Sequence, residues 1–275
     1  MWTKLFLLAM FILMVVGAFR FEPARERTLI ASRTSDGPRL RLMTWNIGYA
    51  DLEKDTRAHN EDLKAVAETI LRHDPDAVAL QELTGEDQLK ILLDHLNNRY
   101  IGAVARLGNA DRIEAVLVKN TNAHFDDVPC GDKFALGATF HMDHIGRDVV
   151  LISAHTDAFV AAKRRDQIEN IVEWGRKHTD NSIVFIAGDL NFEVSVKKGS
   201  NLFTDDPKHD SKTYNYLLKY FRDLGRDAGD TAINDRRIDY IFAPPEIVLL
   251  RRAEVLKGVA AGHMDHWPLL VEVAV

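Results

Sequence analysis

The sequence feature that most restricts the possible folds is an apolar run that stops at two polar side chains. Residues 183–187 (IVFIA) include three β-branched residues, which is typical of a strand buried on both faces. The run ends at 188–191 (GDLN), where Gly188 permits a close backbone approach and a carboxylate and an amide follow. Residues two apart in extended backbone project to the same side, so Asp189 and Asn191 are expected to address one small ligand. An Asx-type turn that leaves the strand is the alternative interpretation.

Strands and helices alternate along the rest of the chain, which indicates an α/β fold with at least one mixed sheet. Apolar residues at helical spacing predict helices over 60–72, 86–97, 161–177 and 214–221. Apolar or alternating runs predict strands over 40–47, 76–80, 100–105, 113–119, 123–128, 134–141, 148–155, 183–187, 237–242, 249–256 and 269–275. Residues 197–212 are polar and are expected to form a long loop.

The N-terminus is predicted to lie outside the fold. Lys4 precedes an apolar stretch of 15 residues, 5–19, that ends at Arg20. This stretch is shorter than the ~20 residues of a spanning helix and matches the apolar region of a secretory signal. We therefore expect a signal peptide, or alternatively an uncleaved signal-anchor, over 1–20, followed by a linker over 21–38 and one domain over 39–275. The protein is expected to be exported, as a periplasmic, extracellular or membrane-anchored protein.

Charge and cysteine content exclude some classes of site. The formal net charge is −6, and the densest basic cluster is only Lys163-Arg164-Arg165, so no basic footprint for nucleic acid is evident. A bound divalent cation would dominate the local charge, so a phosphate substrate stays possible. Cys130 is the single cysteine, which excludes an intramolecular disulfide and a thiolate zinc site.

Polar residues recur where the predicted strands end, which is where open α/β sheets usually carry their sites. Six such clusters occur in the order Thr44-Trp45-Asn46, Leu80-Gln81-Glu82, Ser153-Ala154-His155, Gly188-Asp189-Leu190-Asn191, Arg237-Ile238-Asp239-Tyr240-Ile241-Phe242 and Met264-Asp265-His266-Trp267-Pro268.

In this order the clusters resemble the endonuclease/exonuclease/phosphatase (deoxyribonuclease I-like) superfamily, over roughly residues 40–275. The resemblance implies an α/β (α+β) four-layer sandwich, in which two mixed β-sheets pack face to face with helices on both outer sides. It also implies metal-dependent hydrolysis of phosphodiesters or phosphomonoesters, and we expect a monomer. One departure is Met264, which stands where many members of the superfamily have Ser.

Hydrolysis of a phosphate ester needs a hard cation, an activated water and charge stabilisation on the phosphoryl oxygens. Glu82 is suited to bind Mg²⁺ or Mn²⁺, and Asn46 to ligate the ion or orient the carboxylate. Asp265 is a candidate second metal ligand. Taken singly, residues such as Asn46 and Glu82 are more often caps or surface groups than metal ligands.

The resemblance implies catalytic roles for the remaining residues. Asp189 would orient the attacking water, and Asn191 would donate to a phosphate oxygen. His266 would act as the base or stabilise the phosphate, with Asp239 fixing its tautomer and its charged form. His155 would donate to the phosphate or to the leaving oxygen. Taken alone, Asp239 could form an ordinary ion pair and His155 could be a buried core histidine.

Two other patterns are interpreted as structural. The string 141–144 (HMDH) repeats 263–266 (HMDH), but it lies between two predicted strands and is expected to be a hairpin turn rather than a metal site. Ser153 and Cys130 have neither a G-x-S-x-G elbow nor a Cys–His pairing and are not expected to be nucleophiles.

The sequence therefore predicts a metal-dependent phosphoesterase, with phosphodiester hydrolysis of the nuclease type as the first choice. A phosphatase or phosphodiesterase acting on lipid headgroups or sugar phosphates is the alternative. The substrate would be nucleic acid, phospholipid or a phosphorylated small molecule, and residues 5–19 would provide any membrane contact. A non-catalytic binding domain is a third reading, which the full set of polar clusters argues against.

Overall fold

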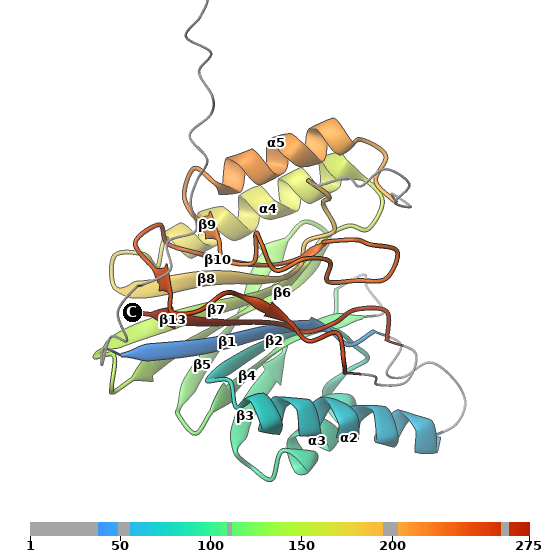
Figure 1. The fold of residues 1–275 in the computed structure, drawn as a ribbon, viewed down its shortest axis with the longest axis vertical. Coiled ribbons are helices and arrows are strands. Elements are labelled where there is room, and N and C mark those ends of the chain that lie inside the picture. The colour runs from blue at the N-terminus through green and yellow to red at the C-terminus, as the bar shows by residue number, and fades with distance from the viewer. Residues whose placement is uncertain (1–37, 49–55, 109–111, 195–202, 260–263) are drawn as a thin grey trace, which may run out of the picture.

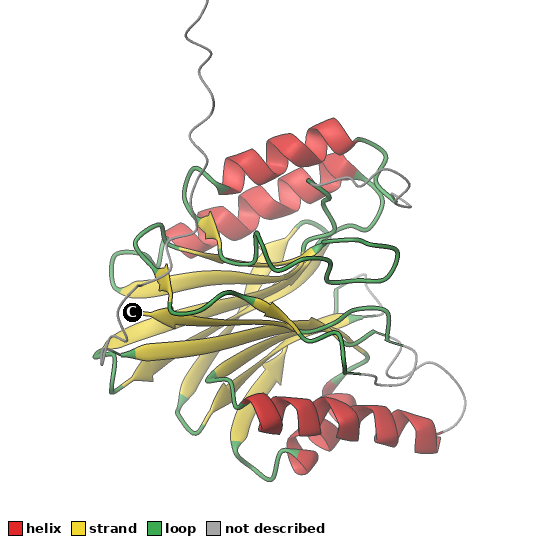
Figure 2. Cartoon of the chain, in the orientation of Figure 1, coloured by secondary structure: helices red, strands yellow, loops and turns green. Residues whose placement is uncertain are grey.

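The protein folds as two β-sheets packed face to face, with a pair of helices on each outer side (Figure 1, Figure 2). This computed structural model describes residues 38–48, 56–108, 112–194, 203–259 and 264–275. The predicted four-layer architecture is confirmed. Both sheets are mixed, because each contains one parallel pair of strands among antiparallel neighbours.

The first sheet has seven strands and is built from the two ends of the chain. Its order is β11-β13-β1-β2-β4-β3, and β12 also pairs with β13. The bounds are β1 Arg39–Asn46, β2 Ala77–Leu83, β3 Tyr100–Val104, β4 Ile113–Lys119, β11 Val248–Leu249, β12 Glu254–Val255 and β13 Leu269–Ala274. Because β1 and β2 are parallel, their carboxyl ends lie at the same edge.

The second sheet has six strands from the middle of the chain. Its order is β5-β6-β7-β8-β10-β9, and β7 and β8 are its parallel pair. The bounds are β5 Ala123–Cys130, β6 Lys133–Met142, β7 Arg147–His155, β8 Ser182–Asp189, β9 Arg222–Asp223 and β10 Asp239–Ala243.

Helices cover the outer face of each sheet. Helices α2 (Thr56–His73) and α3 (Glu86–His95) lie against the first sheet, and α4 (Ala161–Arg176) and α5 (Pro207–Leu217) against the second (Figure 1). Successive side chains of β8 alternate between the two apolar layers on either side of the sheet. Its residues Ile183 and Phe185 belong to the core between the sheets, whereas Val184 and Ile186 pack toward α4 and α5. The prediction that this strand is buried on both faces is confirmed.

Gly188 allows β8 to approach β7 closely just before the polar cluster. Its φ angle is +143°, and a Cβ atom there would overlap the carbonyl oxygen of Ala154. Any other residue would meet both the backbone strain and this overlap.

Gly188→Ala is therefore expected to destabilise the fold by about 2–5 kcal/mol, the combined order of a strained backbone angle and an overpacked site. Denaturant unfolding followed by circular dichroism measures this loss. Gly146→Ala is a suitable comparison for strain alone, because Gly146 has φ +67° but no atom within 4 Å of the added Cβ. A Gly188→Ala variant no less stable than Gly146→Ala would contradict the role given to the close approach.

Two predicted elements are wrong. The loop expected over 197–212 contains the first half of α5, which begins at Pro207 rather than at Tyr214. Asp206 caps this helix by accepting from the backbone N–H groups of Lys208 and His209, at 2.9 and 3.0 Å. The strand expected over 249–256 is instead the two short strands β11 and β12. The side chains of Arg251 and Arg252, which lie between them, donate to Glu272 and to the backbone of Asp227.

The hairpin turn predicted at 141–144 is confirmed. His141 and His144 lie at the hairpin between β6 and β7, where His141 pairs with Asp148 at 2.7 Å and His144 bonds the carbonyl oxygen of Arg39 at 2.8 Å. The Ser153 hydroxyl donates to the carbonyl oxygen of Leu80 at 2.9 Å, which ties the two sheets together. Cys130 is buried.

The segments predicted as signal (1–20) and as linker (21–38) lie outside the described residues, except for Pro38, and stay predictions. Residues 49–55 and 195–202, which include part of the loop predicted over 197–212, lie outside them as well. No helix in the described part of the chain is long and apolar enough to cross a membrane.

Candidate active site

The carboxyl ends of four strands, two from each sheet, converge on one edge of the sandwich. Strand β1 ends at Asn46, β7 at His155 and β8 at Asp189, and Glu82 lies near the end of β2. His155 and Asp189 are paired in register across β7 and β8. Because the sheets face each other, the amide of Asn46 lies 3.0 Å from Asp189 on the opposite sheet.

A β-bulge in β2 directs Glu82 into this edge. The pairing of β2 with β4 shifts register between Leu80 and Leu83, and Glu82 adopts the left-handed conformation with φ +64°. Gly48 packs so close to the carboxylate that a Cβ atom there would overlap it. The bulge and Gly48 therefore fix the position of the Glu82 carboxylate.

Asn46 links two carboxylates from different sheets. Its Nδ2 donates to Glu82 Oε1 at 2.9 Å and to Asp189 Oδ2 at 3.0 Å. Its Oδ1 accepts from the backbone N–H of Gly48 at 2.8 Å. Asn46 therefore faces the carboxylates with its amide nitrogen and orients both of them.

Asp189 is at the centre of the arrangement. Its Oδ1 accepts from the backbone N–H of Asn191 at 3.1 Å, so it closes an Asx turn while Oδ2 points into the site. Oδ2 lies 3.7 Å from Nε2 of His155 and 3.6 Å from Nε2 of His266. The Asp189 side chain thus does both things that the two interpretations of this cluster predicted: it closes a turn with one oxygen and contributes the other to a polar site.

The environment of Asp189 favours its neutral form. Burial raises the pKa of this carboxyl to about 7, and the negative charges of Asp239 and Glu82 act in the same direction, against His266 and the Asn46 hydrogen bond. A carboxyl with a pKa near neutrality can accept and release a proton at physiological pH.

His266 forms a buried pair with Asp239, its Nδ1 lying 2.8 Å from Asp239 Oδ2. Burial alone would lower the pKa of His266, but the carboxylates of Asp239 and Asp189 outweigh it and raise the pKa to about 10. His266 is therefore an imidazolium at neutral pH, and its Nδ1–H donates to Asp239.

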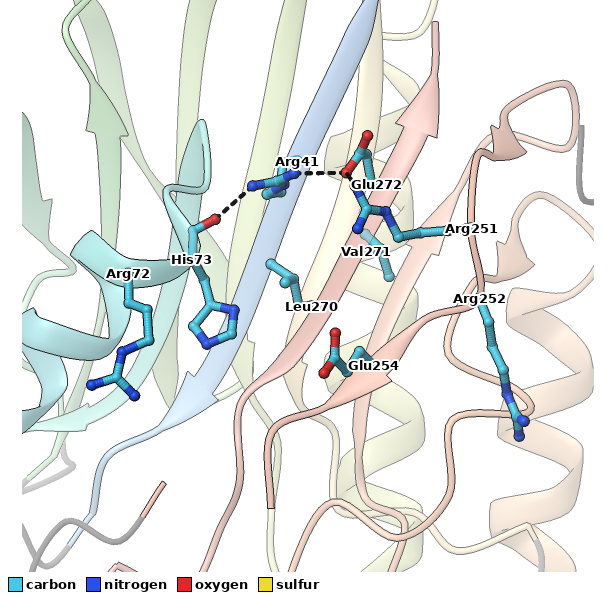
Figure 3. A pocket seen from close by; sticks show the side chains of 9 residues that line it. All are labelled: Arg41, Arg72, His73, Arg251, Arg252, Glu254, Leu270, Val271 and Glu272. Atoms are coloured by element: carbon cyan, nitrogen blue, oxygen red, sulfur yellow. Dashed lines mark hydrogen bonds and ion pairs between the residues drawn. The ribbon is translucent and has the colours of Figure 1, made fainter. Parts of the chain in front are cut away.

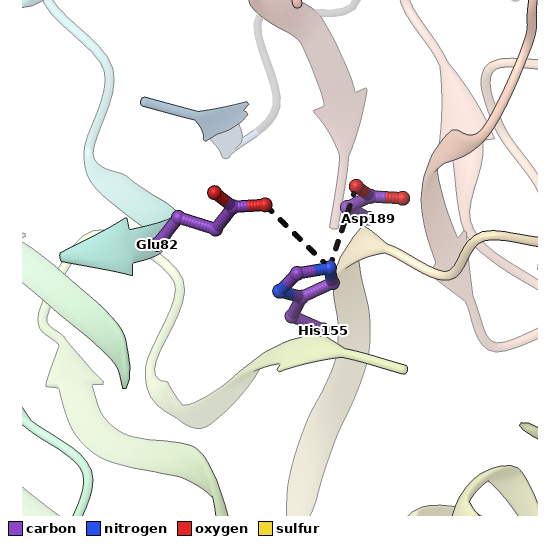
Figure 4. Close-up of side chains that lie close together, drawn as sticks. All are labelled: Glu82, His155 and Asp189. Atoms are coloured by element: carbon purple, nitrogen blue, oxygen red, sulfur yellow. Dashed lines mark ion pairs between the residues drawn. The ribbon is translucent and has the colours of Figure 1, made fainter. Parts of the chain in front are cut away.

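The pKa of His155 is shifted in the opposite direction to that of His266. It lies between two carboxylates, with Nε2 3.8 Å from Glu82 Oε1 and 3.7 Å from Asp189 Oδ2 (Figure 4). Burial, with the positive charges of Lys133 and His266, lowers the pKa of His155 well below its ordinary value. One edge of the fold thus holds a neutral and a charged imidazole, a separation typical of acid–base sites.

The structure places the last two predicted residues at the margin of this cluster. The Asn191 side chain donates to the carbonyl oxygen of Thr156 at 3.2 Å, and its backbone is left-handed with φ +52° rather than extended. Asp265 lies at the more exposed side, with Oδ1 3.9 Å from Nε2 of His266. The expectation that Asp189 and Asn191 share one face of extended backbone is wrong, because the Asx turn intervenes.

Three supporting residues had no role assigned from the sequence. The Trp45 indole donates to the carbonyl oxygen of His266 at 3.1 Å, and the Thr231 hydroxyl accepts from the backbone N–H of Asp239 at 3.0 Å. Glu114 is buried beside His155, and burial raises the pKa of its carboxyl to about 8. Trp45 belongs to the Thr44-Trp45-Asn46 cluster and Glu114 stands out as an acidic residue within the apolar strand 113–118, whereas nothing in the sequence singles out Thr231.

The donor set fits a hard divalent cation. Ligand atoms of Glu82, His155 and Asp189 lie within 4.8 Å of one another. The buried Oδ1 of Asp239 has no hydrogen-bond partner within the described structure. Carboxylate oxygens are the ligands that Mg²⁺ and Mn²⁺ prefer, and a cation would offset the repulsion among these acids.

A cavity of about 120 Å³ lies apart from these residues, beside the C-terminal end of α2 (Figure 3). Four of its nine lining residues are arginines. Arg41 and Arg251 both donate to Glu272, at 2.8 and 2.5 Å, and Arg252 donates to the backbone of Asp227. Three of its four arginines are thus bonded within the protein, and we assign no role to this cavity.

Comparisons with known proteins agree with the fold. The sequence profile described as the Endonuclease/Exonuclease/phosphatase family matches residues 43–261. No curated protein sequence matches the chain significantly.

Three solved structures show the likeness of fold, each aligned over 86% of this chain. A humanized TDP2 of D. rerio is 14% identical over 99% of its own length, with a TM-score of 0.67. An endonuclease/exonuclease/phosphatase of Beutenbergia cavernae is 19% identical over 72% of its length, with a TM-score of 0.67. A mannosyl-6-phosphatase of Bacteroides thetaiotaomicron is 17% identical over 100% of its length, with a TM-score of 0.65.

Proposed function

Since the chain belongs to the endonuclease/exonuclease/phosphatase family, we propose that it is a divalent-cation-dependent hydrolase whose substrates are phosphodiesters. One observation carries the proposal. The Oδ2 atom of Asp189 lies 3.0 Å from the Asn46 amide and within 3.7 Å of two imidazoles, of which His266 is cationic and His155 is neutral. This arrangement supplies a proton acceptor and a cationic donor at one point.

We assign the metal ligands to the exposed side of the cluster. Glu82 would hold Mg²⁺ or Mn²⁺, with Asp265 as a second oxygen ligand and Asn46 orienting the Glu82 carboxylate. A bound cation of this kind polarises phosphoryl oxygens and offsets charge that develops on them.

The proton acceptor of the reaction is Asp189. Its Oδ2 would accept a hydrogen bond from the attacking water and orient it toward phosphorus, and a pKa of about 7 suits this task. Asn191 uses one amide hydrogen on Thr156, and its second would donate to a non-bridging phosphate oxygen.

The two histidines would take different parts. The His266 imidazolium would donate from Nε2 to a phosphoryl oxygen, while Asp239 holds its Nδ1–H and its charge. His155 is neutral and would donate one hydrogen bond to the phosphate or the leaving oxygen.

Hydrolysis of phosphomonoesters of sugars or of lipid headgroups is the second candidate. It is supported by the likeness of fold to a mannosyl-6-phosphatase and by the net charge of −6, which does not favour a long polyanion. A non-catalytic binding role is less well supported, because binding alone does not require a carboxylate held among two imidazoles and two further acids.

The test is a substrate panel assayed with the purified protein in Mg²⁺ and in EDTA. The panel contains plasmid DNA, RNA, sphingomyelin, phosphoinositides, a mononucleotide and mannose 6-phosphate. We expect the protein to hydrolyse a phosphodiester. EDTA should abolish this activity, and added Mg²⁺ or Mn²⁺ should restore it. Activity that is indifferent to the chelator would refute the metal-dependent mechanism.

Glu82→Gln is expected to lower this activity about 100-fold or more, because an amide loses the charge that binds the ion. A second measurement does not depend on turnover. Mg²⁺ should raise the Tm of the unsubstituted protein, since a ligand that binds only the folded state stabilises it, and should do so far less in Glu82→Gln. Glu254→Gln, at an exposed position outside the site, is the matched control and should behave like the unsubstituted protein.

A further inference from the structure

Two exposed phenylalanines pack against each other near the candidate active site. Phe159 is 62% exposed and Phe203 is 49% exposed. Their ring centroids are 6.2 Å apart and their planes meet at 72°, so the rings are edge to face. An exposed pair of large apolar side chains marks a candidate contact surface for a ligand.

The chain leads directly from the site to both rings. Phe159 follows His155 by four residues, and the intervening Thr156 donates from its backbone to Asp189 at 3.1 Å. On the other side, the guanidinium of Arg236 lies 4.5 Å from the centre of the Phe203 ring.

Arg236 itself is tied to the site through its backbone. Its carbonyl oxygen accepts from Ala232 at 3.0 Å, and Ala232 is also bridged to His266. Neighbouring strands are about 4.8 Å apart, so Arg236 lies within about 10 Å of His266. The side chain of Arg236 also donates to Glu193, two residues after Asn191, so both rings lie on segments that adjoin the candidate site.

A buried ion pair holds the two loops in place. Arg164 is fully buried and pairs with Asp210 at 2.9 Å. It also donates to the carbonyl oxygen of Asp157 at 2.8 Å and to the hydroxyl of Thr204, one contact in each loop. The backbone N–H of Asp205 donates to the carbonyl oxygen of Phe159 at 3.0 Å. The backbone that carries the rings is therefore held in place before any ligand arrives, which reduces the entropic cost of binding.

We propose that Phe159 and Phe203 form an aromatic platform that binds a nucleobase carried by the substrate. The inference rests on the proposed function, because the phosphate of the same molecule would lie at Asp189 and His266. Flat heterocycles stack on aromatic side chains without any need for a hydrogen-bond code, and each stacked base strengthens binding about 10-fold or more.

The charges around the rings favour a nucleotide-sized ligand over a membrane or a long polymer. The same two loops carry the carboxylates of Asp157, Asp205 and Asp206. Of the nearby cations, Lys163 pairs with Asp157 at 3.7 Å, and the buried Arg236 beside Phe203 pairs with Glu193. Anionic lipid surfaces and additional backbone phosphates would be repelled there. A single uncharged base would meet no such penalty.

The decisive experiment compares the binding of adenosine 5′-monophosphate and ribose 5-phosphate, which differ only in the base. Calorimetric titrations use the full chain in Mg²⁺ with Asp189→Asn, a change that prevents turnover. We expect the nucleotide to bind about 10-fold more tightly than the sugar phosphate. The double substitution Phe159→Ala/Phe203→Ala should bring this ratio close to one by weakening only the nucleotide. Leu107→Ala, at an apolar position that is 59% exposed, should leave the ratio unchanged.

Three results would overturn the platform. The first is equal or undetectable binding of the two ligands. The second is a ratio of nucleotide affinity to sugar-phosphate affinity that is unchanged by the double substitution. The third is a ratio that falls as much in Leu107→Ala as in the double substitution. Binding to phosphatidylserine vesicles that depends on the two phenylalanines, without selectivity for the nucleotide, would assign the rings to a membrane instead. A phenylalanine-dependent ratio in a protein that hydrolyses no phosphate ester would leave the platform standing and refute the proposed function alone.

Discussion

Asp189→Asn is expected to reduce phosphodiester hydrolysis about 1,000-fold or more while the protein stays folded. The substitution keeps the shape of the side chain, and Oδ1 can still accept from the backbone N–H of Asn191, so the Asx turn is preserved. It replaces the oxygen that faces both imidazoles with an amide nitrogen, which cannot accept a proton from water. Initial rates in Mg²⁺ measure the loss, and circular dichroism with thermal unfolding measures the fold.

Asp143→Asn provides the matched control, because Asp143 is a fully exposed acid at the hairpin between β6 and β7. Its activity should equal that of the unsubstituted protein. If Asp189→Asn kept more than about a tenth of the activity, a loss far below the usual effect of removing a general base, Asp189 would not be the proton acceptor.

His266→Ala is expected to reduce activity by a similar factor, about 1,000-fold, because it removes a buried cation that faces the carboxylates of Asp189 and Asp239. His144→Ala is the control from the other HMDH string, where the imidazole bonds a backbone carbonyl at the hairpin, and should be nearly silent. A large loss in His144→Ala together with a small one in His266→Ala would show that the roles of the two strings have been exchanged.

The charge of His266 also predicts how activity depends on pH. Asp239 is the strongest of the groups that raise the pKa of His266 to about 10, so Asp239→Asn should lower that pKa. If the imidazolium is the active form, the alkaline limb of the rate profile should move to lower pH in this variant. NMR titration of the histidine side chains measures the pKa directly. An unchanged alkaline limb alongside a lowered pKa would show that the charge of His266 is not required.

The elements that were predicted correctly have strong local patterns. Strand β8 reads as buried on both faces because its five apolar residues lie between two hydrophobic layers. The polar residues at the ends of β1, β7 and β8 could be grouped because parallel strands bring their carboxyl ends to one edge. The pairing of Asp239 with His266 was expected from the resemblance, and the structure shows its geometry.

The features that were missed depend on contacts between distant segments. The bulge that turns Glu82 inward arises from the pairing of β2 with β4, and nothing in 80–83 indicates the register shift. Thr231 meets Asp239 only because a loop folds back over β10. The start of α5 was missed although the sequence contains a local signal for it. Asp206-Pro207 is an ordinary N-cap followed by a first-turn proline, but the residues around it are polar and suggested a loop.

The site is divided between the two sheets, with Asn46 and Glu82 on one and His155 and Asp189 on the other. The distance between their reactive atoms is therefore set by the thickness of the apolar layer that separates the sheets, which includes Phe185 and Leu42. A conservative change of volume in that layer can misalign the catalytic groups without touching any of them. Selection for activity should consequently restrict the interior of this protein almost as tightly as its catalytic residues, and few of its inward-facing positions should be free to drift.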